Sequence, residues 1–380
     1  MKTRILIVCQ WPLGGIRTYM KYVYRHFPAD EFEMTLLASP SVVKEHVTRD
    51  MEGLPVTVKW APYFHGRKVL FWHVFKELRT NKYDLIHAQG FISAFHAAAA
   101  NWFFKVPHVL TIHGIIEQGY LEGWLAPIKR FIFRGAMKNV TVFHGVGKDI
   151  LEHFRERFPS LDHPRSRWIT ITNGISTQRF GRTKDNPGAY LRSECGIADD
   201  VFIFGFFGRF IPQKGFNYII DAVDKLAKEG KPARDFLILS FGGTDMVNEY
   251  RAEVGRRGLD KYFQFEGFRS DISDVMMGCD AVPMPSIWEA WPLLAAEVFC
   301  CGVPLIASDC IGLREASEDT PALKIPTHDV DALAGAMAAV MSDDKYKAEA
   351  QAFRTEAVKR FDVGRTAEQM LRLFREITAR

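Results

Sequence analysis

The sequence predicts an α/β protein of two domains, each with a parallel sheet covered by helices. The chain has 380 residues, more than one hydrophobic core usually supports. Hydrophobic residues make up 47% and charged residues 25%, which is ordinary globular composition and excludes a disordered or disulfide-stapled chain. In both halves short β-rich runs alternate with longer stretches of helical spacing, the pattern of parallel sheets with helical crossovers.

The first half begins with an apolar run, Arg4–Cys9, which predicts a buried strand. Gly14-Gly15 predicts a tight turn, and Ile16–Phe27 carries apolar residues at helical spacing. Further strands are expected at Met34–Ala38, Val56–Trp60, Asp84–His87, His108–Ile112, Val140–Phe143 and Trp168–Thr172.

The stretch Leu85–Phe104 has no Asp, Glu, Lys or Arg and is long enough to cross a bilayer. Histidine, glutamine and asparagine side chains interrupt it, so we expect a strand, a turn and a buried helix instead. The apolar run Ile5–Cys9 is too short for a signal peptide. Six cysteines without C-x-x-C spacing then indicate reduced thiols and a cytoplasmic protein.

The second half repeats the alternation after a polar stretch, Ser176–Pro187, which we interpret as a linker. A strand, a loop and a helix are expected first, then more strands and a largely helical end. They are Val201–Phe207, Gly208–Gly215 and Phe216–Glu229, strands near Phe236–Phe241, Tyr262–Phe265, Ala281–Met284 and Val303–Ala307, and helical residues Val330–Arg360 and Val363–Ile377. Ligands of such sheets bind at the carboxyl ends of strands, so the natural site is a cleft between the two domains.

Charge is distributed unevenly along the chain. Residues 1–180 hold 24 Lys/Arg and 14 Asp/Glu, or +10, whereas residues 181–380 hold 25 and 31, or −6. The asymmetry is compatible with solvated faces alone. It also fits a first half that meets an anionic membrane surface or a charged acceptor.

The loop after strand Val201–Phe207 carries two cations in a glycine-bounded segment, Gly208–Gly215. Arg209 offers a bidentate fork and Lys214 a point charge, a combination that suits a diphosphate. Loop cations are common, so this feature by itself is also compatible with a solvated loop.

A second segment, Pro285–Glu297, places two carboxylates around a helix start at Pro292. The free amides of that start could bind phosphate oxygens. Glu297 lies roughly 7–8 Å along the helix axis, near the spacing between a diphosphate and the ribose of one nucleotide. Glu297 could therefore accept hydrogen bonds from ribose hydroxyls, while Glu289 reaches the group beyond the phosphates.

These segments together resemble the Glu-x7-Glu motif of retaining glycosyltransferases of family 4. Glu289 and Glu297 match the two acids, and Arg209 with Lys214 match the Gly-Arg-…-Lys-Gly loop. The surroundings also match, at Pro285-Ser286, Pro292-Leu293, Gly302-Val303-Pro304, Gly14-Gly15, Thr111–Gly114 and Asn173–Ile175. Two positions depart from the pattern, since Ser176 replaces an Asp and Ala290 a Gly.

The resemblance implies a GT-B fold, in which two Rossmann-like, doubly wound domains face each other across a cleft. Residues 1–178 would form the acceptor-side domain, with helix 363–380 packing back on it, and residues 179–362 the donor domain. It also implies site roles. His113 would contact the donor sugar in the reaction centre, together with Glu289, Arg209 and Lys214. The donor would be bound by Gly14, Gly15, Arg209, Lys214, Phe268, Arg269, Leu293, Leu294 and Glu297, with Phe268-Arg269 beside the base.

The activity that the resemblance implies is transfer of a hexose, with retention, from a UDP-sugar or GDP-mannose, with a slight preference for UDP. The acceptor would be a glycan or a lipid-linked molecule of cell-surface polysaccharide or glycolipid synthesis, and no nucleic acid would bind. The two loop cations can replace a metal, so we expect metal independence and no tightly bound cofactor. Front-face substitution and double displacement both stay open. Alternatives are a nucleotide-sugar epimerase of the same fold and a non-catalytic nucleotide-sugar-binding subunit.

Residues 124–138 mix bulky apolar residues with four cations. The pattern fits an interfacial amphipathic helix, and equally a half-buried helix with a basic solvent face. Together with the +10 charge, it leads to the hypothesis of peripheral contact with anionic membrane at its cytoplasmic face.

Overall fold

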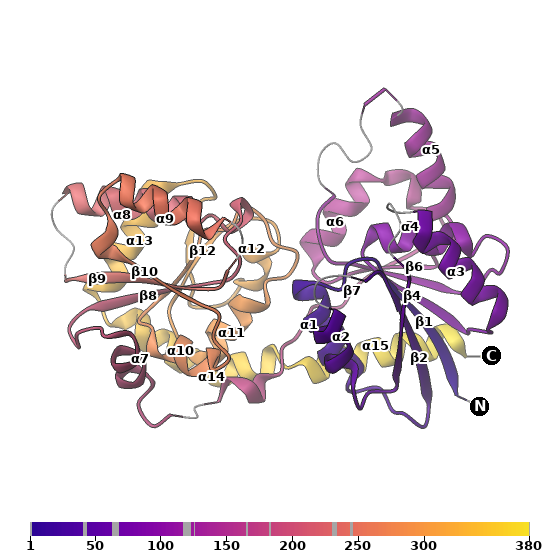
Figure 1. Ribbon diagram of the computed structural model, residues 1–380, viewed down its shortest axis with the longest axis horizontal. Helices are drawn as coiled ribbons and strands as arrows, with labels where there is room; N and C mark the ends of the chain where they lie inside the picture. The colour runs from indigo at the N-terminus through magenta and orange to yellow at the C-terminus, as the bar shows by residue number, and fades with distance from the viewer. Residues whose placement is uncertain are drawn as a thin grey trace. The chain divides into compact units, whose positions relative to one another are not determined.

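The computed structural model describes residues 2–40, 44–62, 68–116, 123–124, 126–164, 166–181, 184–229, 234–243 and 246–379 (Figure 1). The chain divides into two compact units. Unit 1 comprises Met1–Gly174 and Val363–Arg380, and unit 2 comprises Ile175–Asp362. The chain thus changes unit after Gly174, slightly before the position that the sequence suggested.

Unit 1 contains one sheet of seven strands in the order β3-β2-β1-β4-β5-β6-β7. All neighbouring pairs are parallel. The seven predicted strands are confirmed, with ends shifted by up to two residues. Their bounds are β1 (Thr3–Cys9), β2 (Phe32–Ala38), β3 (Val56–Trp60), β4 (Leu85–Gln89), β5 (His108–Ile112), β6 (Val142–Gly145) and β7 (Arg167–Thr170).

Helices cover both faces of this sheet (Figure 1). One face carries α1 (Gly14–Tyr24), α2 (Lys44–Met51) and α15 (Val363–Thr378), and the other carries α3 (Lys68–Thr80), α4 (Phe91–Ala100), α5 (Ala126–Met137) and α6 (Lys148–Arg157), followed by the 3-10 turn η1 (Pro159–Leu161). Helix α15 adds Ala367, Met370 and Phe374 to the core, where Phe374 packs edge-on against Phe27 with ring centroids 5.5 Å apart. The last helix is therefore part of the unit 1 core.

The uncharged stretch Leu85–Phe104 forms strand β4, a turn at Gly90 and the buried helix α4, as predicted. In the described part of the chain, no helix is both long and apolar enough to span a membrane.

Unit 2 contains two three-stranded parallel sheets, β10-β9-β8 and β11-β12-β13. A parallel bridge between Phe204 and Ala281 joins β8 to β11. Counted from β8, the combined order is 3-2-1-4-5-6, the Rossmann order. The bounds are β8 (Phe202–Phe207), β9 (Phe236–Phe241), β10 (Phe263–Gly267), β11 (Val282–Met284), β12 (Leu305–Ser308) and β13 (Leu323–Ile325). The first five were predicted, whereas β13 has only three residues and shows no readable pattern.

Helices also cover both faces in unit 2, with α8, α9 and α13 on one side and α7, α10, α11 and α14 on the other (Figure 1). The bounds are α7 (Pro187–Cys195), α8 (Phe216–Glu229), α9 (Val247–Arg256), α10 (Ile272–Gly278), α11 (Leu293–Cys301), α12 (Leu313–Ala316), α13 (Val330–Ser342) and α14 (Lys345–Arg360), with 3-10 turns η2 (Thr177–Phe180), η3 (Pro212–Lys214) and η4 (Asp260–Tyr262).

Two sequence expectations in unit 2 need correction. The helical stretch Val330–Arg360 is two helices, because Asp343 adopts an extended conformation at φ −142° and ψ 113°. The linker at Ser176–Pro187 contains ordered structure. Thr177 donates a hydrogen bond of 2.7 Å to Asp362, and Arg354 donates one of 3.3 Å to the carbonyl of Phe180.

Candidate active site

A pocket of about 580 Å³ opens at the carboxyl ends of β8, β9 and β10 in unit 2. Six of the residues singled out in the sequence for donor binding line it. They are Arg209, Lys214, Phe268, Arg269, Leu294 and Glu297. The pocket thus contains two cations from one loop and a carboxylate from helix α11. It lies where the Rossmann order places ligands, at the carboxyl edge of a parallel sheet.

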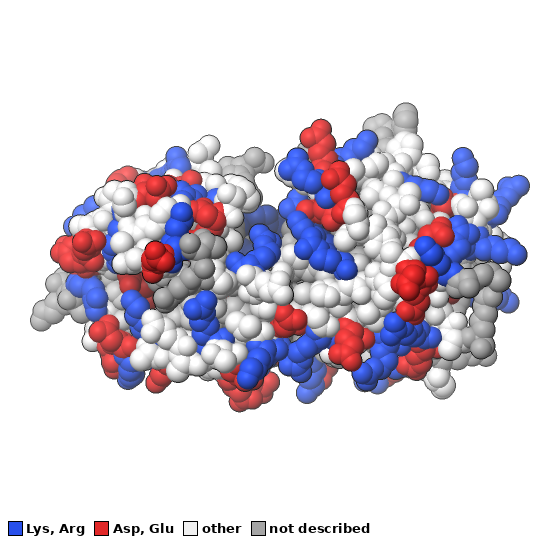
Figure 2. Space-filling model, turned by 90° about the horizontal axis from the view of Figure 1, so that it is seen from below, with Lys and Arg blue, Asp and Glu red and all other residues white. Residues whose placement is uncertain are grey.

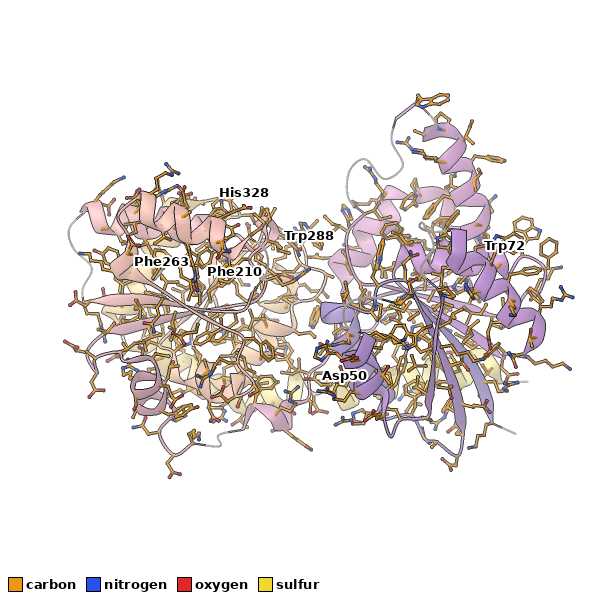
Figure 3. All side chains as sticks on the ribbon, in the orientation of Figure 1. Asp50, Trp72, Phe210, Phe263, Trp288 and His328 are labelled. Carbon is orange, nitrogen blue, oxygen red and sulfur yellow. The ribbon has the colours of Figure 1, made fainter. Side chains whose placement is uncertain are left out.

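The loop that carries Arg209 and Lys214 is held by a buried aromatic residue between them. Phe210 is fully buried and packs against Phe216 with ring centroids 4.9 Å apart, within the aromatic core that also contains Phe263 (Figure 3). The burial of Phe210 fixes the backbone on which both cations stand. The anchor explains how an exposed loop can present two charges in a defined arrangement.

The same loop is tied to the segment after β11. Gly215 has φ +70°, and a Cβ atom there would lie 2.0 Å from the carbonyl oxygen of Pro285, so only glycine fits. Gln213 donates a hydrogen bond of 2.9 Å to the carbonyl of Trp288, which is labelled in Figure 3. The two segments therefore form one rigid wall.

An ion pair links the two segments of this wall. Lys214 Nζ donates to Glu289 Oε1 over 2.7 Å, and Ser286 Oγ donates to the same oxygen over 2.8 Å. Glu289 is only 5% exposed. A buried carboxylate needs such partners, so Lys214 both compensates Glu289 and lines the pocket.

Glu297 is the central residue of α11, lies among apolar residues in the sequence of that helix and lines the pocket. Burial raises the pKa of its carboxyl from 4.5 to about 7, and the positive charge of Arg179 opposes this shift. A carboxyl with this pKa is poised to change its charge near neutral pH when a hydrogen-bond donor arrives.

The start of α11 differs in one detail from the prediction. Pro292 is the N-cap residue, with φ −76° and ψ 102°, and the helix begins at Leu293. The side chain of proline accepts no hydrogen bond, so it does not cap the amides of the first turn. Leu294 lines the pocket directly, whereas Leu293 precedes it at the helix start.

Phe268 and Arg269 both line the pocket, but they differ in exposure and in hydrogen bonding. Phe268 is 89% exposed. The Arg269 guanidinium donates to Asp271 over 2.7 and 2.9 Å and to the Tyr190 hydroxyl over 3.0 Å. Arg269 is thus held by its own unit, while Phe268 presents an open aromatic face.

The lining residues that were missed in the sequence include Arg179 from η2 and Gly242-Gly243 after β9. Gly242 has φ +137°, and a Cβ atom there would lie 2.0 Å from the carbonyl oxygen of Gly208. A glycine pair directly after the strand Phe236–Phe241 was a readable signal. Arg179 had none, because it lies in the stretch that was interpreted as a linker.

A second, smaller pocket of about 160 Å³ lies in unit 1 at the carboxyl ends of β1, β4 and β5. His113 lines it beside Gln10, Trp11, Ile16 and Gln89, among others. His113 Nε2 lies 2.6 Å from Gln89 Oε1, and burial lowers the pKa of His113 to about 3, so its ring is neutral at neutral pH.

Gly14 and Gly15, expected as a tight turn, are the first residues of helix α1, and Gly14 has φ +52°. Neither glycine is among the residues that line the unit 1 pocket, although Trp11 and Ile16 on either side are. In the described residues, no group of three or more His, Cys, Asp or Glu side chains is arranged to hold a metal ion.

Two Rossmann-like units, each with a pocket at the carboxyl edge of its sheet, form the architecture of the GT-B fold. Comparison with known families agrees. Residues 191–360 match the family model described as glycosyl transferases group 1, and residues 13–179 match glycosyltransferase family 4. The two matches together span most of the chain, which belongs to glycosyltransferase family 4.

Individual relatives are distant but extensive. UDP-Gal:alpha-D-GlcNAc-diphosphoundecaprenol alpha-1,3-galactosyltransferase of Escherichia coli is 21% identical over 95% of this chain and 94% of its own. D-inositol 3-phosphate glycosyltransferase of Kribbella flavida is 29% identical over 78% of this chain and 72% of its own. HepE of Anabaena, solved in complex with UDP-glucose, has a TM-score of 0.80 at 21% identity and covers 98% of this chain and 99% of its own.

Proposed function

We propose that the protein is a retaining hexosyltransferase. It moves a sugar from a nucleoside diphosphate donor to a glycan or lipid-linked acceptor in cell-surface polysaccharide or glycolipid synthesis. The observation that carries the proposal is the unit 2 pocket, where Arg209, Lys214 and Glu297 converge. Two cations beside one carboxylate fit a nucleotide, whose diphosphate is anionic and whose ribose donates hydrogen bonds.

Each residue then has a part in the reaction. Arg209, Lys214 and the α11 amides near Leu293 and Leu294 stabilise the charge that develops on the leaving diphosphate. Glu297 accepts hydrogen bonds from the ribose. The cations take the place that a metal would otherwise fill, so we infer metal-independent transfer.

Glu289 is best suited to hold a sugar hydroxyl. Its Oε1 already accepts hydrogen bonds from Lys214 and Ser286, and the side chain is almost fully buried. A carboxylate held in this way is a poor nucleophile, which favours front-face substitution over double displacement. Phe268 and Arg269 border the base. His113 and the Gly14-Gly15 segment, which belong to unit 1, contact the donor sugar.

The names of two relatives indicate which donor and acceptor to expect for this chain. The E. coli enzyme is named for UDP-galactose and a diphosphoundecaprenol acceptor, and HepE was solved with UDP-glucose. A UDP-sugar is therefore favoured over GDP-mannose. A lipid-linked diphosphate also matches the +10 charge of residues 1–180.

The test combines binding and transfer. Calorimetry against UDP-glucose, UDP-galactose and GDP-mannose identifies the donor, and transfer of labelled sugar to polyprenyl-diphosphate-linked acceptors follows. NMR of the product reports the anomeric configuration. An inverted product would refute retention. Conversion of free donor without acceptor would indicate an epimerase, and binding without hydrolysis or transfer a non-catalytic subunit.

We also propose that unit 1 contacts anionic membrane through its exposed aromatic surface, at the cytoplasmic face. This surface consists of large apolar side chains on α3, at the end of α4, and on or just before α5, each more than half exposed: Trp72, Trp102, Phe103, Trp124, Ile128, Phe131 and Ile132. Trp72 extends from α3 at the outer edge of the unit (Figure 3). Helix α4 contacts both α3 and α5, so the three elements adjoin.

Helix α5 supports this interpretation over that of a basic solvent face. Phe133, Ala136 and Met137 are buried, while Ile128 and Phe131 are turned outward. An apolar stripe directed away from the core is unusual in a surface helix and typical of one that enters a lipid interface.

The charges near α5 complement anionic lipid. Residues 123–138 contain no Asp or Glu. Arg130 and Arg134, together with Arg157, line a pocket of about 270 Å³ that suits the phosphate of a lipid headgroup. On the face shown in Figure 2, by contrast, positive and negative side chains are interspersed.

Vesicle co-sedimentation at low salt tests this surface. The chain should bind vesicles that contain phosphatidylglycerol more tightly than neutral ones, and a Trp72→Ser/Phe103→Ser/Phe131→Ser variant should lose most of the binding. Phe268→Ser is the control, because this phenylalanine is more exposed than any of the three but lies in unit 2. Unchanged binding by the triple variant would refute the proposal.

A further inference from the structure

The core of unit 1 contains a continuous chain of polar side chains that ends at His113. It is built from Tyr24 on α1, His87 and Gln89 on β4, Thr111 on β5 and His144 on β6. All five are at most 2% exposed. Thr111 is the register partner of Gln89 on one side and of His144 on the other, so the row crosses three adjacent strands near their carboxyl ends.

Every link in this chain has the length of a hydrogen bond. From the far end, the distances are 3.0 Å from His144 Nε2 to the carbonyl oxygen of Ile171, 2.9 Å from Thr111 Oγ1 to His144 Nδ1, 2.7 Å from His87 Nε2 to Thr111 Oγ1, 2.9 Å from Tyr24 Oη to His87 Nδ1, 2.8 Å from Gln89 Nε2 to Tyr24 Oη and 2.6 Å from His113 Nε2 to Gln89 Oε1. Buried polar groups of this kind polarise one another and stabilise a single arrangement.

The carbonyl of Ile171 sets the direction of all six bonds, because a carbonyl oxygen only accepts. His144 must donate from Nε2, so its Nδ1 accepts from the hydroxyl of Thr111. That hydroxyl has one proton, already used, and therefore accepts from His87 Nε2. His87 Nδ1 then accepts from the hydroxyl of Tyr24.

The same logic reaches the pocket. The Tyr24 oxygen, its proton used, accepts from the amide nitrogen of Gln89. The other end of that amide is the oxygen, so His113 donates to it from Nε2. Each step requires neutral rings, and burial lowers the pKa of His87, His113 and His144.

We propose that Tyr24, His87, Gln89, Thr111 and His144 are positioning residues, which hold His113 in the Nε2–H tautomer and fix its ring. Nδ1 is then the acceptor nitrogen of His113, and it can accept a hydrogen bond from a substrate hydroxyl in the unit 1 pocket. The part of this inference that concerns turnover rests on the proposed function. The tautomers themselves do not depend on it.

NMR of the full-length chain with ¹⁵N-labelled histidine tests the direction of the relay. Long-range ¹H–¹⁵N spectra should show His87, His113 and His144 as neutral Nε2–H tautomers at pH 7. A neutral Nδ1–H tautomer at any of the three, or a protonated ring, would overturn the proposal. This result is independent of any transfer activity.

A matched pair of variants tests the positioning role. Thr111→Val removes the hydroxyl that links His87 to His144, while Thr111→Ser keeps it; neither changes a residue that lines the pocket. Thr111→Val should shift the His113 ring signals and lower kcat/KM roughly 10- to 100-fold, through misplacement of His113, and Thr111→Ser should restore both.

Tyr24→Phe provides a second break in the relay if Thr111→Val folds poorly. It should give the same His113 shifts and the same loss of turnover. If both variants fold and leave the His113 signals unchanged, the positioning role is refuted and the network is structural only. If the wild-type tautomers are as proposed but no transfer is found, the proposed function fails while the relay stands.

Discussion

Replacing Glu297 with glutamine tests the carboxyl whose pKa is raised in the candidate donor pocket. The pKa of Glu297 rises from 4.5 to about 7 on folding, because of burial. The folded chain therefore binds this proton more tightly than the unfolded chain. Its contribution to stability is present below about pH 4.5 and is lost as the pH rises through 7.

The size of the loss follows from the two pKa values. Their separation corresponds to about 3 kcal/mol of unfolding free energy, an upper limit because the carboxyl faces an open pocket. Glu297→Gln removes the titration while keeping shape. We therefore expect the variant and the wild type to respond differently to pH, with the variant gaining up to about 3 kcal/mol relative to the wild type between pH 4.5 and 8.

Ligand binding should show the opposite slope. A ribose donates hydrogen bonds, so it prefers the ionised carboxylate. With a pKa of about 7, affinity for a nucleotide sugar should increase about tenfold from pH 6 to pH 8. Urea unfolding and calorimetry with UDP-glucose, on wild type and Glu297→Gln, measure both effects. Equal pH slopes for binding in the two proteins would refute the ribose role, and equal slopes for unfolding would refute the raised pKa.

Two further predictions concern the loop that carries the two cations, and a third concerns the need for a metal ion. Arg209→Ala and Lys214→Ala should each lower kcat about 10²- to 10³-fold; only Lys214→Ala should also lose roughly 3 kcal/mol of stability, because it leaves Glu289 buried and unpaired. Normal rates at saturating donor in both variants would contradict the phosphate role. Gly215→Ala should destabilise the chain by at least about 2 kcal/mol in urea unfolding, since φ is +70° and the methyl group would meet the carbonyl of Pro285. Gly243→Ala, where no atom of the described residues lies within 4 Å of the added carbon, should be nearly neutral, and similar losses in both would contradict the steric argument. EDTA should leave turnover unchanged, and activity that is lost with EDTA and restored by Mg²⁺ would show that a metal is needed.

The sequence predicted the fold well because strands of a parallel sheet are buried on both faces and therefore form continuous apolar runs. Twelve strands were expected, and each has its counterpart in the structure. The three-residue strand β13 and the break at Asp343 could not be read, since both depend on neighbours that the local pattern does not reveal. The ordered residues of the supposed linker are held by Asp362 and Arg354, which are far away in the chain.

Part of the candidate site could also be predicted from the sequence. Arg209, Lys214 and Glu297 follow or flank recognisable elements, so their meeting in one pocket was predictable from strand order. The pairing of Lys214 with Glu289 was not, because it depends on two loops locked through Gly215. The polar row behind His113 was hidden as well, since His87 and His144 look like isolated residues in apolar strands.

The path of helix α15 has a consequence for how the protein is made. Unit 2 is covalently complete once Asp362 has been synthesised, whereas unit 1 still lacks Ala367, Met370 and Phe374 from its core. On the ribosome, the segment begun second is thus the first that can finish folding. Unit 1, whose synthesis begins first, cannot finish folding until α15 has been made, and Phe27 stays uncovered until then. Chaperones would be needed most during this interval.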